Sequence, residues 1–199
     1  MKNKNKFMEL KTKRLILRPP KMSDWKDIVE GVGEYDVAKM LLKVPHPYKK
    51  KDAEDFINKT IKEWNNKKSA ENYLFFIELK SERKVIGAIG IHRIKFFSKT
   101  GTTGSWINKK YWKKGYITEA KIAVNDFAFN KLKLRRLDSE VFADNKASNA
   151  TQIKMGYKLE GTKRQSVKSH ASGKIHDENI YGLLKEDWKK VKNKFVKYK

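Results

Sequence analysis

Strand-like and helix-like segments follow a fixed order along this chain, and that order constrains the fold. Seven short runs rich in apolar and β-branched residues are predicted as strands; they cover residues 15–18, 73–79, 85–94, 102–107, 137–142, 157–161 and 178–184. The early strands form hairpins, and the later ones alternate with segments that have apolar residues at helical spacing. This order favours a mixed α+β fold, in which helices flank a mostly antiparallel sheet of about seven strands.

The length and the charge of the chain indicate one domain with basic ends. The 199 residues suit a single domain, and the formal net charge is +24. We expect a basic N-terminal tail over residues 1–13, a folded domain over 14–188 and a basic C-terminal tail over 189–199. Lysine runs at chain ends are typical of solvated tails, although so much positive charge also suits an anionic partner.

Composition excludes several classes of protein. With no cysteine, the chain has no disulfide framework, no thiolate zinc site and no cysteine nucleophile. No apolar run is long enough to cross a bilayer, and the first residues lack the apolar core of a secretion signal. The four histidines do not have the spacing of metal ligands. We therefore expect a cytoplasmic protein with no metal and no membrane contact.

Residues 111–120 are predicted to bind an anion. Gly115 lies between a strand and a helix, where a helix N-terminus presents unpaired backbone N–H groups. Lys113 and Lys114 add positive charge at the same point. A phosphate or pyrophosphate would suit this turn, although a glycine before a helix can also serve only to let the chain turn. The P-loop pattern G-x-x-x-x-G-K-[ST] is absent.

With these segments in view, the sequence resembles the GNAT acetyltransferase superfamily, in particular its ribosomal-protein N-terminal alanine acetyltransferase (RimJ/RimL) type. The matching elements occur in the family's order and span most of the predicted domain. They are residues 12–18, 85–90, 104–107, 111–120, 145–148, 155–157, 160–161, 177–181 and 187–188.

The resemblance implies the GNAT fold, with a splayed sheet, and acetyl-CoA as co-substrate. Acetyl-CoA would lie between the strand ending at Ile107 and the strand ending at Phe142. Its pantetheine arm would pair with the backbone near Trp106, and its pyrophosphate would lie on the amides after Lys113. The implied cofactor-binding residues are Trp106, Ile107, Lys113, Lys114, Gly115, Tyr116, Ile117, Thr118, Asn145 and Ser148. Asn145 and Ser148 also suit a helix cap and its first turn.

The sequence departs from the family at three places. Ile117 stands where a small residue is usual, which puts the pyrophosphate contact in question. Thr102 and Thr103 lie on the strand where many relatives have a glutamate, and Gln152 stands where other branches have a tyrosine acid. The sequence therefore shows neither an obvious base nor that tyrosine acid.

The missing base favours an acceptor amine of low pKa. Neutralising an α-amine at pH 7 costs about 1.4 kcal/mol, whereas a lysine amine costs about 4.6 kcal/mol. A water chain to Glu140, Asp144 or Glu160 could still provide a base, and Ser148 is the candidate donor of a proton to the leaving thiolate. The catalytic candidates are thus Ser148, Glu140 and Glu160.

We predict an acetyl-CoA-dependent N-acetyltransferase that acts on a protein or peptide N-terminal α-amine, or on a small amine. The alternatives are a catalytically inactive GNAT-like protein that binds acetyl-CoA, and a basic module that binds RNA or the ribosome. Ribosome association through the basic surface is open for the enzyme too, and the sequence fits a monomer or a homodimer.

Overall fold

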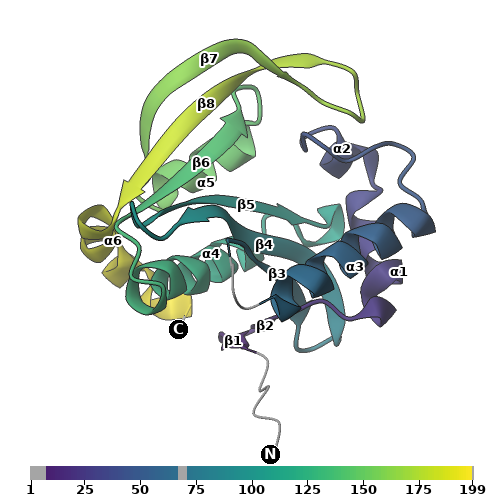
Figure 1. Ribbon diagram of the computed structural model, residues 1–199, viewed down its shortest axis with the longest axis horizontal. Helices are drawn as coiled ribbons and strands as arrows, with labels where there is room; N and C mark the ends of the chain where they lie inside the picture. The colour runs from purple at the N-terminus through teal and green to yellow at the C-terminus, as the bar shows by residue number, and fades with distance from the viewer. Residues whose placement is uncertain (1–7, 67–70, 199) are drawn as a thin grey trace, which may run out of the picture.

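The structure, a computed structural model, describes residues 8–66 and 71–198. In that part of the chain an 8-stranded sheet has the order β1-β2-β3-β4-β5-β6-β8-β7 (Figure 1). The strands are β1 (Leu10–Lys11), β2 (Leu15–Arg18), β3 (Tyr73–Leu79), β4 (Lys84–Lys95), β5 (Thr100–Ile107), β6 (Arg136–Phe142), β7 (Lys158–Lys168) and β8 (Ile175–Leu184). Neighbouring strands are antiparallel except for β5 and β6, which are parallel. The predicted mixed α+β class is confirmed, and each predicted strand is present.

Helices cover both faces of the sheet. They are α1 (Trp25–Val32), α2 (Tyr35–Ala38), α3 (Lys50–Asn65), α4 (Tyr116–Asp126), α5 (Lys146–Lys154) and α6 (Lys185–Val191). Alternation along β3 separates two apolar clusters: Phe75 joins the cluster of α4 on one face, and Phe76 joins the cluster of α1 and α3 on the other. Helices α1, α3 and α4 therefore bury their apolar sides against the sheet.

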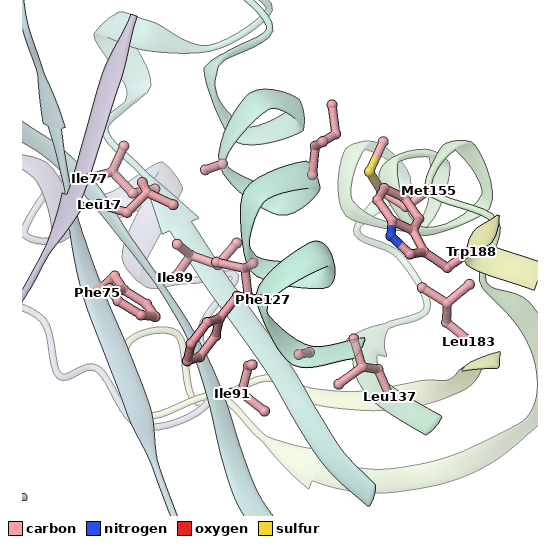
Figure 2. Packing of buried hydrophobic residues seen from close by; sticks show 14 of the residues in the cluster. Leu17, Phe75, Ile77, Ile89, Ile91, Phe127, Leu137, Met155, Leu183 and Trp188 are labelled. Carbon is pink, nitrogen blue, oxygen red and sulfur yellow. The ribbon is translucent and has the colours of Figure 1, made fainter. Parts of the chain in front are cut away.

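The larger cluster fixes α4 against the sheet. Figure 2 shows Ile89 and Ile91 of β4 facing Phe127, at the end of α4, while Trp188 of α6 packs near Leu183 of β8. A 3-10 segment, Lys192–Tyr198, continues after α6, and Phe195 in it is buried against Trp188. Helical structure thus continues past residue 189, where the sequence analysis expects a basic C-terminal tail to begin. That boundary stays a prediction.

The β7–β8 hairpin extends from the sheet and bends toward α2 (Figure 1). Near its tip, His170 N donates to Leu42 O at 3.1 Å, which joins the hairpin to the segment between α2 and α3. The tip of the hairpin therefore lies beside the segment that follows α2.

Candidate active site

The sheet splits between β5 and β6. Their parallel pairing includes only three positions and ends at Thr102 and Asp138. Beyond these, β5 stays paired with β4 as far as Ile107, and β6 stays paired with β8 as far as Phe142. The facing edges of β5 and β6 thus present backbone N–H and C=O groups with no strand partner. These are the two strands between which the sequence resemblance puts acetyl-CoA.

Backbone alternation determines which residues of β5 face the split. Asn108 N donates to Ile86 O of β4 at 2.8 Å, so residues at even positions direct their amides toward β4. Ser105 and Ile107 therefore face the split. The amide of Trp106 faces β4, and its ring packs on α1, where a Cβ added at Gly31 would lie 2.8 Å from it. Trp106 thus packs the strand against α1. On the open edge, the backbone of Ser105 takes the position that the sequence analysis expects for the backbone of Trp106.

The turn before α4 has the geometry of an anion site. Gly115 is the N-cap of α4, and its φ of 79° lies in the left-handed region. No side chain caps this end of α4, so the amides of residues 116–118 have no partner within the helix. The side chains of Lys113 and Lys114 are exposed. Ile117 packs against the core, so its side chain does not occupy the turn, and the free amides there could hold a phosphate group.

A buried carboxylate, which the sequence analysis did not identify, holds this turn in place. Glu119 of α4 has a fully buried side chain and accepts from Thr12 Oγ1 at 2.6 Å and from Arg14 N at 2.7 Å. Arg14 Nε donates to the second carboxylate oxygen at 2.7 Å, and its guanidinium lies 4.3 Å from the centre of the Tyr116 ring. The start of β2 and the start of α4 are thereby tied together.

The N-terminus of α5 faces β6. Asn145 Oδ1 accepts from Ser148 N at 3.1 Å, so Asn145 is the cap of this helix. Ser148 is half-buried, and its hydroxyl has no hydrogen-bond partner among the described residues. That hydroxyl is therefore free to bind a ligand.

The carboxylates suggested by the sequence are paired with cations. Glu140 accepts from Arg93 at 2.6 Å, and Asp144 binds Lys174 at 2.6 Å. Glu160 binds Arg136 with contacts of 2.8 and 2.5 Å, which lowers the pKa of Glu160 from its ordinary value. Arg136 lies at the closed end of the split, opposite Thr100. The structure therefore argues against Glu160 as the base.

Two other groups on one face of the sheet suit a base better. Glu178 of β8 is buried at 8% exposure with no ion pair or hydrogen bond to its carboxylate among the described residues. Burial, and then the charge of Glu140, raise the pKa of Glu178. His92 of β4 has a lowered pKa because of burial and the charges of Arg93 and Lys59, so it is neutral at pH 7. Glu178 pairs with Phe142 of β6 and so shares a sheet face with it, a register that the sequence alone does not show.

Other features of the surface do not form a second centre. A depression of about 480 Å³ at β2 and β3 is lined by Arg18, Asp24 and Glu78, which already bind one another. Within residues 8–66 and 71–198, no group of three His, Asp or Glu side chains could hold a metal ion. The helices in those residues include none that is long and apolar enough to cross a membrane.

The split sheet, the glycine turn and the capped N-terminus of α5 are the arrangement that the sequence resemblance implies for an acetyltransferase. Residues 14–158 match the family described as the acetyltransferase (GNAT) domain. This match covers well over half of the chain, so the chain belongs to the GNAT acetyltransferase family.

Individual relatives agree with this assignment. The chain is 28% identical over 183 residues to the uncharacterized N-acetyltransferase YnaD of Bacillus subtilis, covering 91% of this chain and 99% of YnaD. It is 33% identical over 109 residues to YoaA of the same organism, covering 55% of this chain but only 60% of YoaA. It is 28% identical over 103 residues to a ribosomal-protein-serine acetyltransferase of Escherichia coli, covering 52% and 56%.

A solved structure gives the same result. A GNAT-family acetyltransferase from Bacillus anthracis matches with a TM-score of 0.76 and 28% identity, covering 90% of this chain and 99% of that one. The prediction of an acetyl-CoA-dependent N-acetyltransferase is thereby confirmed, and acetyl-CoA is its co-substrate.

Proposed function

We propose that this enzyme acetylates the N-terminal α-amine of a protein or peptide, with a small amine of low pKa as the second candidate. The observation that carries the proposal is the joined hairpin: the hydrogen bond from His170 N to Leu42 O links the β7–β8 hairpin to the segment after α2, and in this proposal the two border the approach to the β5–β6 split. A slender, extended chain end fits an approach bordered in this way. The similarity to a ribosomal-protein-serine acetyltransferase supports a protein acceptor.

In this proposal the chain binds acetyl-CoA through backbone groups. The amides of residues 116–118 and the charges of Lys113 and Lys114 hold the pyrophosphate. The free edge of β5 at Ser105 and Ile107 pairs with the pantetheine arm, in the manner of an added strand. Ile107 O already accepts from Trp112 Nε1 at 2.8 Å, so Ile107 offers its N–H. Acetyl-CoA supplies the activated acetyl group as a thioester.

Glu178 is the proposed general base. Its raised pKa makes it a stronger base than Glu160, because burial destabilises the charged form of Glu178, whereas the hydrogen bond from Arg136 lowers the pKa of Glu160. An α-amine needs only about 1.4 kcal/mol for deprotonation at pH 7, which a carboxylate of this strength can assist. His92 is the alternative base on the same face.

An acceptor panel tests the substrate class. Free CoA release is measured with a peptide that has a free N-terminus and a blocked lysine side chain, and with the matched peptide in which the blocking is reversed. Polyamines and aminoglycosides complete the panel. We expect the free N-terminus to give the higher kcat/KM, because its pKa is about 2.5 units lower than that of lysine. A preference for the free lysine side chain would contradict the proposal.

Replacing the proposed base tests its role. We expect Glu178→Gln to lower kcat/KM by roughly 100-fold or more, the usual size of general-base catalysis, with little change in acetyl-CoA affinity. Glu160→Gln is the matched control and should have a smaller effect, since Glu160 is bound to Arg136. A larger loss for Glu160→Gln would reverse the assignment.

Ribosome association and a cytoplasmic location stay proposals of the same kind. The exposed strand β7 has Lys163, Arg164 and Lys168, which provide a basic surface in the described part of the chain. Association through such a surface would weaken steeply with added salt.

A further inference from the structure

Lys121 is a buried lysine on α4 for which the reaction described so far has no use. Only 3% of it is exposed, and no carboxylate in the described residues binds it. Its one hydrogen bond joins Nζ to Gln152 Oε1 of α5 at 3.3 Å. Its Nζ also lies 5.8 Å from the centre of the Tyr157 ring. A buried cation without an anionic partner is costly to the fold, so its presence needs an explanation.

The contacts of Lys121 lead to the point where the sheet splits. The hydroxyl of Tyr157 lies 3.0 Å from Thr103 Oγ1, and that same Oγ1 donates to Asp138 O at 3.2 Å. Thr103 is the first residue of β5 beyond the paired region, and Asp138 is the last paired residue of β6.

Lys121 also has a direct connection to the helix that faces the split. Gln152 follows Ser148 by four residues on α5, so both side chains lie on one face of that helix, a turn apart. Lys121 is thus connected through Tyr157 to the apex of the split and through Gln152 to the face of α5 that bears Ser148.

We propose that the Lys121 ammonium protonates the leaving CoA thiolate. The inference rests on the proposed placement of acetyl-CoA between β5 and β6. A C–N bond forms and the C–S bond of the thioester breaks, and the electron pair of the broken bond goes to sulfur. Lys121 Nζ gives sulfur a proton; the acceptor amine loses one proton to the base, and Lys121 regains a proton from water.

The titration of Lys121 suits this role. Burial lowers the pKa of Lys121 to about 8, close to the value of about 8.5 for an ordinary thiol, which is the match that efficient proton transfer requires. No charged group among the described residues contributes to this shift, and the neighbouring Tyr157 is neutral because burial raises its pKa. The anion that would balance Lys121 therefore arises only when the C–S bond breaks.

Binding measurements test the inference apart from turnover. Affinities of CoA and of desulfo-CoA, which lacks the sulfur atom, are measured at pH 7 and near pH 8.5 with the wild type, Lys121→Met and Lys131→Met. We expect the wild type to prefer CoA by about tenfold near pH 8.5, as for a charge-assisted hydrogen bond. Lys121→Met should lose that preference, and the exposed control Lys131→Met should keep it. Equal preference in the wild type and Lys121→Met would overturn the inference.

The same experiment separates this inference from the proposed cofactor site. If both ligands bind without a sulfur preference, Lys121 has no role at the thiol but the site stands. If neither ligand binds, the placement of acetyl-CoA fails. Should Lys121→Met not fold, Lys121→Gln gives the same comparison.

Turnover and unfolding give two further readouts. We expect Lys121→Met to lower kcat by roughly 100-fold or more and to remove the fall of kcat above pH 8. A larger loss for Ser148→Ala, with this fall retained in Lys121→Met, would assign the proton to Ser148 instead.

The native state binds fewer protons at Lys121 than the unfolded chain between pH 8 and 10.5, so wild-type stability relative to Lys121→Met should rise with pH across that window. A constant difference would contradict the lowered pKa.

Discussion

Gly115→Glu is expected to abolish acetyl-CoA binding. At a φ of 79° the backbone of any residue with a Cβ is strained, at a cost of about 1–2 kcal/mol. The new carboxylate would also stand among the amides of residues 116–118, where the pyrophosphate is proposed to bind, and would repel it. The measurement is the rise in melting temperature with acetyl-CoA, which reflects about 2.7 kcal/mol at one hundred times the Kd for the wild type.

Gly173 provides a matched control for this variant. It lies in the β7–β8 hairpin with a φ of 68°, and a Cβ added there has nothing within 4 Å. Gly173→Glu therefore introduces the same charge and a similar backbone strain away from the turn. We expect it to keep the ligand-induced shift. If Gly115→Glu also kept that shift, the phosphate would have to bind elsewhere.

Local patterns explain why the strands and the turn could be predicted from sequence. Runs rich in apolar and β-branched residues predicted β3 and β4, and Gly115 between a strand and a helix predicted the turn, because each signal lies within a few neighbouring residues. β1 has only two residues, Leu10–Lys11, which is too short to give an alternating pattern. The predicted cap at Asn145 is also confirmed.

The chemistry of the site depends on contacts between distant segments, which no local pattern contains. Glu140 is neutralised by Arg93, 47 residues away, and Glu160 by Arg136, 24 residues away, so neither pairing could be read from spacing. Glu178 stands out only because its burial is known. Likewise, a lysine within a helix is usually solvated, and no local pattern around Lys121 predicts that it lies in the interior.

The last prediction concerns the free energy of unfolding, and it rests on a buried ion-pair network around Arg18. Only 7% of the Arg18 side chain is exposed; its two terminal nitrogens donate to the Asp24 carboxylate at 2.9 and 2.8 Å, and Nε donates to Glu78 at 2.5 Å. Arg18→Met would leave these two carboxylates without their cation. We expect a loss of about 3–5 kcal/mol, measured by denaturant unfolding at pH 7.

Lys84→Met distinguishes this buried network from an ordinary surface pair. Lys84 binds Glu30 at 2.6 Å with side chains that are 28% and 35% exposed, so its loss should cost no more than about 1 kcal/mol. Because Asp24 immediately precedes α1, and Gly31 of α1 supports the Trp106 ring, we expect Arg18→Met also to loosen the β5 edge. Acetyl-CoA affinity should then fall in Arg18→Met and stay unchanged in Lys84→Met. An equal loss of stability in the two variants would show that the Arg18 network behaves as a surface pair.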